Sequence, residues 1–178
     1  MDHAKPKPGA TFPTTTVSRL GGGELTLGNA SEGYDWQLIV VYRGAHCPIC
    51  TRYLGEIGAI VSDLQDLKIE VVAVSTDSQQ RAEAQIAEAG ISYPVGYGMS
   101  VEQMQALGLY ISSPRHGMNA EVPFAEPGLF LVNEDQELRM VDIANVPFMR
   151  PQVPSLLMGL RFMRGMKEPF PSNGTYAA

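Results

Sequence analysis

The sequence has few cysteines and histidines and no long hydrophobic run. Two cysteines and three histidines in 178 residues cannot supply a four-cysteine iron–sulfur cluster or a framework of several disulfides. No stretch approaches the roughly 18 apolar residues of a membrane-spanning helix, and no apolar signal-peptide core follows Lys5 and Lys7. We therefore expect a cytoplasmic protein without contact to a membrane. In that compartment, two cysteines close in sequence are more often catalytic or metal-binding than structural.

The sequence is also short of positive charge. Its formal net charge is −6 and its pI is about 5.0, so it has no electrostatic footprint for nucleic acid or anionic lipid. Apolar residues make up 44% and charged residues 18%, which is typical of a folded soluble domain. The length suits one domain. We expect an N-terminal arm over residues 1–16, the domain over residues 17–170 and a tail over residues 171–178.

Apolar runs and turn residues predict strands that alternate with helices. Strands are expected at residues 16–18, 25–27, 38–42, 69–74, 93–95, 129–132 and 138–143. Helices are expected from the cysteines to residue 64, from residue 78 to 89, from Ser100 to Gly108, and from residue 154 to 166, with a loop over 112–127. Helices between strands indicate parallel crossovers, and the late hairpin adds antiparallel strands. The prediction is an α/β fold with a mixed central sheet and helices on both faces.

The clearest functional signal is the pair Cys47 and Cys50, which follows the buried strand and opens the next helix. Pro48 suits the first helical position, which places Cys47 at the N-cap and Cys50 in the first turn. Unpaired N–H groups and the positive end of the helix dipole stabilise a thiolate there and lower the pKa of a cysteine. Neighbours on one helical turn need only a small adjustment to form a disulfide. The pair therefore predicts a dithiol–disulfide cycle.

Two other interpretations of the cysteines stay open at this point. The pair could be structural and buried, or it could bind zinc together with His46, His116 or His3. A redox-sensing or zinc-holding binding module is therefore the alternative to a redox enzyme. The redox interpretation requires no metal and no organic cofactor.

The segment Val41–Cys50 resembles the active-site segment of AhpC/TSA-type redoxins, which are peroxiredoxin-like members of the thioredoxin fold. The resemblance extends over about residues 8–170 and includes Phe12–Pro13, Val72–Asp77, Pro127–Val132 and Pro147–Pro151. It implies a thioredoxin-like fold and an oxidoreductase that acts as a thiol-dependent peroxidase or a disulfide reductase. The implied partners are a peroxide or disulfide substrate and an external thiol reductant such as thioredoxin or glutathione, and a homodimer is compatible with it.

Two departures from the family's pattern bear on the mechanism. Typical peroxiredoxins carry Thr-x-x-Cys and a later arginine, which together polarise the bound peroxide. Here Cys47 takes the place of the threonine, Cys50 aligns with the peroxidatic cysteine, and Pro127 stands where the arginine would precede the late strand. In thioredoxins the first cysteine attacks, the second resolves, and a cis-proline faces the pair. The resemblance therefore also implies a cis peptide bond at Pro127.

Four residues are candidates for supporting the cysteines. Arg43 could stabilise a thiolate or replace the missing arginine, and otherwise belongs to a surface ion pair. His46 could lower the pKa of the nucleophile or carry protons, and otherwise lies exposed in the loop. Tyr42 suits packing at the end of its strand better than donating a hydroxyl hydrogen bond to the site. Pro127 would face the cysteine pair.

The residues favour a mechanism in which Cys47 is the nucleophile. Its thiolate would attack a disulfide or a peroxide oxygen and give a mixed disulfide or a sulfenic acid. Cys50 would then close the internal disulfide, and an external thiol would reduce it. If the peroxiredoxin alignment governs instead, Cys50 attacks and Cys47 resolves.

Overall fold

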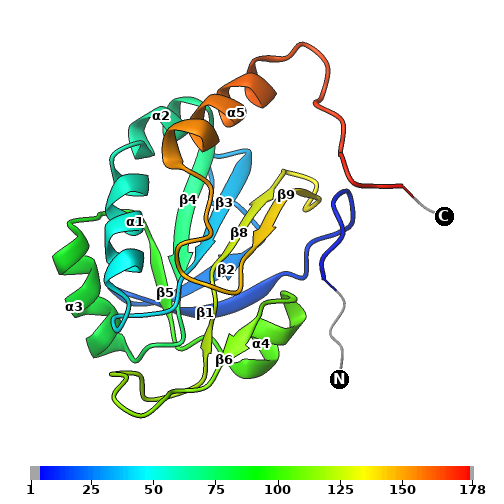
Figure 1. The fold of residues 1–178 in the computed structure, drawn as a ribbon. Helices are drawn as coiled ribbons and strands as arrows, with labels where there is room; N and C mark the ends of the chain where they lie inside the picture. Colours follow the sequence, from blue (N-terminus) through cyan, green and yellow to red (C-terminus); the bar gives the residue numbers. More distant parts are fainter. Residues whose placement is uncertain (1–4, 177–178) are drawn as a thin grey trace.

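The structure, a computed structural model, describes residues 5–176 and contains one large mixed sheet in that range (Figure 1). The sheet has seven strands in the order β2-β1-β5-β4-β3-β8-β9 within the described residues. Its strands are β1 (Thr15–Arg19), β2 (Glu24–Leu27), β3 (Trp36–Val41), β4 (Ile69–Val74), β5 (Val95–Tyr97), β8 (Gly128–Val132) and β9 (Leu138–Ile143). The helices are α1 (Pro48–Gly58), α2 (Val61–Asp66), α3 (Gln79–Ala89), α4 (Val101–Ala106) and α5 (Val153–Gly165).

The centre of the sheet is the parallel pair β3 and β4. Their register runs from Trp36 opposite Ile69 to Val41 opposite Val74, and every residue of both strands is buried. Such continuous burial is expected of strands that are covered on both faces. Because β3 ends in the middle of the sheet, the segment that follows it, including the cysteines, starts at the carboxyl edge, where open α/β sheets bind ligands.

Helices cover both faces of the sheet, as predicted. One core contains Leu38 and Val40 of β3 together with Leu54 of α1 and residues of α2 and α5. The other contains Ile39 of β3 together with Met104 of α4 and the β1–β2 hairpin. This split follows from the alternation of side chains along a strand. Within residues 5–176, no helix is long and apolar enough to cross a membrane.

Two predicted elements differ from the structure. The single helix expected to reach residue 64 is two helices, α1 and α2, which are separated at Ala59 and Ile60. Gly58 and the β-branched pair Ile60 and Val61 lower the helix propensity at that point. The loop expected over residues 112–127 contains β7 (Phe124–Ala125), which pairs with β6 (Ile111–Ser112). Strands of two residues are too short to give a periodic signal.

The segment before β1 packs against the late hairpin. Thr11 forms a bridge to Glu137, and Phe12 is almost completely buried, with 2% of its side-chain surface exposed. β1 begins at Thr15. The boundary expected between the N-terminal arm and the domain, after residue 16, therefore falls inside this strand. The N-terminal segment from residue 9 onward thus contributes to the core on the α4 side of the sheet.

Candidate active site

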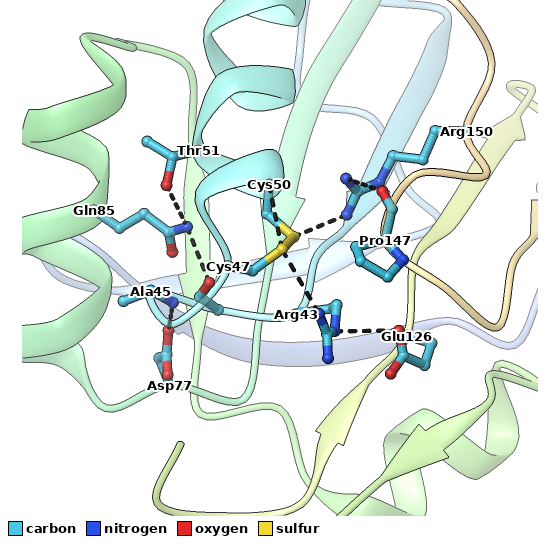
Figure 2. The surroundings of a disulfide bond; sticks show 11 residues. Arg43, Ala45, Cys47, Cys50, Thr51, Asp77, Gln85, Glu126, Pro147 and Arg150 are labelled. Carbon is cyan, nitrogen blue, oxygen red and sulfur yellow. Dashed lines mark hydrogen bonds and ion pairs between the residues drawn. A yellow bond between two sulfur atoms is a disulfide. The ribbon is translucent and has the colours of Figure 1, made fainter. Parts of the chain in front are cut away.

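Cys47 and Cys50 take the predicted places at the start of α1. Cys47 is the N-cap in extended conformation, Pro48 opens the helix, and the sulfur of Cys47 accepts a hydrogen bond from the Cys50 N–H at 3.3 Å. The Cα atoms are 5.2 Å apart and the two sulfurs are at disulfide distance (Figure 2). This separation lies in the normal range for a disulfide. The start of α1 thus holds the two cysteines at a separation that suits a disulfide.

The disulfide is buried but not surrounded by apolar groups alone. The exposed fraction is 3% for Cys47 and 0% for Cys50. Both belong to the core on the α1 side of the sheet. Two guanidinium groups nevertheless reach the sulfur atoms, one from Arg43 and one from Arg150 (Figure 2). The site therefore combines low solvent access with positive charge, and both conditions affect the ionisation of a thiol.

Arg150 is the functional candidate that sequence reasoning missed. Its Nη2 donates to the sulfur of Cys50 at 3.0 Å, and its Nη1 donates to the carbonyl of Pro147 at 2.9 Å. The guanidinium also lies over the ring of Tyr53, 5.1 Å from its centroid. At the other end of the segment, the Tyr53 hydroxyl donates to the carbonyl of Pro151 at 3.1 Å. Residues of α1 thus hold the segment that carries Arg150.

In the described part of the chain, the charge of Arg150 forms no ion pair, and Glu126 and Asp142 act on it only from a greater distance. None of the ion pairs within residues 5–176 involves it. Burial is the main reason that its pKa is lowered to about 10, so the side chain remains a cation at neutral pH. A buried cation without a partner is costly. A thiolate on Cys50 would supply the missing negative charge at 3.0 Å.

Arg43 also reaches the cysteines, but in a different setting. Its Nη1 lies 4.0 Å from the sulfur of Cys47, and its Nε lies 3.2 Å from Oε2 of Glu126. The guanidinium packs over the ring of Phe124 at 4.9 Å. Both members of the ion pair are largely buried, with 15% and 6% of their side chains exposed. Arg43 therefore faces the site while it is already paired with a carboxylate.

His46 lies beside this group rather than in open solvent. Its ring packs against Phe124 with centroids 4.4 Å apart. Both ring nitrogens are buried and find no hydrogen-bond partner among the described residues. Burial and then the charge of Arg43 lower the pKa of His46. The side chain is therefore a neutral imidazole at neutral pH, next in sequence to Cys47.

The loop between β3 and α1 is fixed by groups from β4 and α3. The Asp77 carboxylate accepts the Ala45 N–H at 2.7 Å, and the Gln85 amide donates to the Gly44 carbonyl and to the Thr51 hydroxyl, each at 3.1 Å (Figure 2). Gly44 has φ +119°, and a Cβ at this position would lie 2.6 Å from the Asp77 carboxylate. Only glycine satisfies both conditions. This loop geometry carries Arg43 and His46 toward the cysteines.

Tyr42 and Pro127 are in place as packing residues, and the prediction of a cis bond is wrong. Tyr42 is 1% exposed within the core that contains the cysteines, and burial raises its pKa. No peptide bond within residues 5–176 is cis, the one before Pro127 included. Pro127 continues the chain from β7 into β8 and accepts the Ala144 N–H at 3.0 Å. The ordinary trans preference of an X–Pro bond is satisfied by this path.

The described residues contain no ligand set for a metal. No group of three or more His, Cys, Asp or Glu side chains in residues 5–176 is arranged to hold an ion. His116 is exposed in the loop before β7, and His3 lies outside the described residues. The zinc-holding interpretation thus finds no set of converging ligands in this part of the chain.

Comparisons with known proteins point to one family and one fold. Residues 8–141 match the model of the AhpC/TSA family, and no curated protein sequence matches the chain. A peroxiredoxin-like protein from Aquifex aeolicus is similar in structure, with a TM-score of 0.73 at 16% identity and 90% of each chain covered.

Two further solved structures are similar over most of this chain. AhpC from Mycobacterium bovis has a TM-score of 0.72 at 18% identity, covering 96% of this chain and 98% of its own. A cysteine-to-serine mutant of peroxiredoxin 6 from Arenicola marina has a TM-score of 0.72 at 16% identity, covering 94% and 79%. At these identities the likeness shows the fold, which is the thioredoxin-like α/β fold of peroxiredoxins.

Proposed function

The chain belongs to the AhpC/TSA family, and from this premise we propose that it is a thiol peroxidase that cycles Cys47 and Cys50 between dithiol and disulfide. The observation that carries the proposal is the unpaired Arg150 guanidinium 3.0 Å from the sulfur of Cys50. A cation at this place stabilises a thiolate and can polarise a peroxide bound to it. Arg150 thereby supplies the positive charge that the missing arginine of the family would otherwise provide.

Cys50 is the better nucleophile of the two. Unit charges about 4 Å apart interact by about 4 kcal/mol at an effective dielectric constant of about 20. The start of a helix contributes only about 0.3–1 kcal/mol. Cys47 has the N-cap position and an arginine already paired with Glu126, whereas Cys50 faces an arginine that forms no ion pair within residues 5–176. Charge therefore favours the second of the two mechanisms that the sequence allows.

The catalytic cycle follows from this assignment. The Cys50 thiolate attacks the terminal oxygen of a hydroperoxide, the O–O bond breaks, and the alkoxide or hydroxide leaves and takes up a proton. The resulting sulfenic acid reacts with the Cys47 thiol, which forms the disulfide and releases water. Two external thiol groups, from two glutathione molecules or one thioredoxin dithiol, then reduce the disulfide and are themselves oxidised to a disulfide.

Reduction uses the same charge asymmetry. A reductant thiolate attacks one sulfur and expels the other, and the thiol with the lower pKa leaves faster. Arg150 makes Cys50 the leaving group, so the mixed disulfide with the reductant forms on Cys47. Cys47 is also the less completely buried of the two, with 3% against 0% exposed. Burial and charge thus both favour attack of the reductant on Cys47, with Cys50 as the leaving group.

The segment Pro147–Pro151 lies beside the buried Cys50, which Arg150 of this segment contacts. Phe148 and Met149 of this segment are 71% and 61% exposed, so little packing holds them. Pockets of about 150 Å³ and 410 Å³ lie on its flanks, and Arg150 and Pro151 line both. We expect a small peroxide to approach Arg150 through one of these pockets.

Peroxide consumption tests the proposal. The reduced protein should consume hydrogen peroxide or an organic hydroperoxide with dithiothreitol or thioredoxin as donor, and one equivalent of peroxide should lower the intact mass by two hydrogens. Insulin reduction without peroxide turnover would instead establish a disulfide reductase. A disulfide that forms reversibly with neither activity would establish a redox-sensing module and refute the enzyme.

A further inference from the structure

Glu126 is a buried carboxylate at the cysteine site that the cycle above does not use. It is 5% exposed and follows directly on β7. Its Oε2 lies 3.2 Å from Nε of Arg43, and its Oε1 accepts the Ser112 hydroxyl at 2.7 Å. Its backbone N–H donates to the carbonyl of Tyr110 at 2.8 Å. Side chain and backbone are therefore both fixed, with the charge directed at Arg43.

This carboxylate makes the two halves of the disulfide electrostatically unequal. Figure 2 shows Glu126 beside Arg43 and apart from Arg150. The cation next to Cys47 forms an ion pair with Glu126, whereas the cation next to Cys50 forms none within residues 5–176, and Glu126 and Asp142 act on it only from a greater distance. A negative charge near a thiol opposes its ionisation, and a positive one favours it. The position of one carboxylate is thus enough to separate the two thiols.

We propose that Glu126 is a positioning residue that selects the nucleophile: it holds Arg43 and cancels its charge, so that the thiolate forms on Cys50 rather than on Cys47. The catalytic consequence rests on the proposed peroxidase function. The order in which the two thiols ionise is independent of that function, because it can be measured on reduced protein without peroxide.

The other charged and titratable groups around the cysteines leave this asymmetry in place. They are Arg43 and His46 after β3, Tyr53 of α1, Asp77 after β4, Arg81 of α3, Asp142 of β9, and Arg150. Asp77 is occupied by Arg81 at 3.1 Å and by the Ala45 N–H. Burial lowers the pKa of His46 and raises that of Asp142, which favours the neutral form of each. Substitution of Glu126 removes the ion pair of Arg43 and leaves the pair of Asp77 with Arg81 in place.

Glu126→Gln removes the charge and keeps the shape. A glutamine amide can accept from Arg43 through its oxygen and donate to the Ser112 hydroxyl, which is also an acceptor. In the variant Arg43 is uncompensated, so Cys47 should ionise at lower pH. At a pH below its midpoint, the alkylation of Cys47 should rise about tenfold, which corresponds to about one pKa unit. The midpoint of Cys50 should change less.

The measurement is a brief pulse of limiting iodoacetamide on the reduced full-length protein over a range of pH, with both cysteine peptides quantified by mass spectrometry. Glu137→Gln is the matched control, because it removes a carboxylate 3.1 Å from Arg139, outside the cysteine site. It should leave both midpoints unchanged. A Glu126→Gln protein in which the midpoint of Cys47 stays fixed or rises would overturn the proposal.

If Glu126→Gln does not fold, a double variant tests whether Glu126 cancels the effect of Arg43 on Cys47. Arg43→Met with Glu126→Gln removes both members of the buried pair, which is often neutral for stability. If Glu126 cancels Arg43, the midpoint of Cys47 stays as in the wild type. A higher midpoint in the double variant would show that Arg43 acts on Cys47 despite Glu126 and would refute the selection. Lack of peroxide consumption by the wild type would refute the proposed function alone.

Discussion

Arg43 and Arg150 both bring a guanidinium group to the Cys47–Cys50 pair, but from different regions and with different compensation of charge. Arg43 comes from the loop that leads into α1 and is paired with Glu126. Arg150 comes from the segment after β9 and has no carboxylate partner in the described residues. This difference shows that a position near a cation or a helix start is not sufficient to stabilise a thiolate. A cation that is already paired with a carboxylate stabilises a thiolate less than an unpaired cation does.

The largest effects are expected from the cysteines themselves. Cys50→Ser should lose peroxide consumption by about a thousandfold or more, because the nucleophile is gone. Cys47→Ser should still react once with peroxide and should accumulate a sulfenic acid on Cys50, seen as a gain of one oxygen by mass spectrometry. The opposite outcome, with peroxide reacting at full rate in Cys50→Ser, would reverse the roles of the two halves.

Removal of the uncompensated charge should have the next largest effect. Arg150→Met keeps an unbranched side chain but no cation, so the reaction of Cys50 with peroxide should slow by about 10–100-fold at neutral pH. The rate should recover as the pH is raised, because the thiol then ionises without help. Arg52→Met on the exposed side of α1, where the side chain is 74% exposed, is the control. Equal rates in all three proteins would exclude Arg150 from the reaction.

The loop on the Arg43 side can be disturbed through its glycine. Gly44→Ala requires a residue with a Cβ at φ +119° and 2.6 Å from the Asp77 carboxylate, so unfolding should become easier by about 1–3 kcal/mol. Gly117→Ala, at φ +80° with open space around it, separates the backbone strain from the clash. Chemical denaturation measures both variants. A Gly44→Ala protein no less stable than Gly117→Ala would show that Asp77 does not confine this loop.

Much of this arrangement could be predicted from the sequence, because it depends on local patterns. The strands β3 and β4, the capping box of α4 and the N-cap position of Cys47 follow from short-range periodicity and capping chemistry. Arg150 could not be predicted as a partner of Cys50, since the contact joins residues 100 positions apart. It depends on how the chain returns after β9, which no spacing encodes.

The ion pair between Arg43 and Glu126 could not be predicted from the sequence for a similar reason. It depends on β6 and β7, which have two residues each and pair across the intervening loop. The cis bond expected at Pro127 failed because it came from a general feature of the fold and not from the residues around that proline. Interactions between remote segments thus decide the part of the site that the sequence leaves open.

The smallest effect is expected on the stability of the fold in acid. Burial and Arg43 lower the pKa of His46 in the folded protein, so the unfolded chain binds a proton at this residue more readily. Stability is therefore complete above the pKa of an unfolded histidine and decreases as the pH falls through and below it. His46→Gln should reduce this loss, whereas the exposed His116→Gln should not. Thermal unfolding at neutral and mildly acidic pH tests this, and equal acid sensitivity in wild type and His46→Gln would contradict it.

The Arg150 guanidinium, which forms no ion pair in the described residues, should make Cys50 the first thiol to ionise. The most direct test follows the alkylation of each cysteine in the reduced wild-type protein as the pH is raised, with the two peptides separated by mass spectrometry. The midpoint of Cys50 should lie below that of Cys47, and Arg150→Met should raise the midpoint of Cys50 until the two converge. A midpoint of Cys47 below that of Cys50 in the wild type would contradict the account.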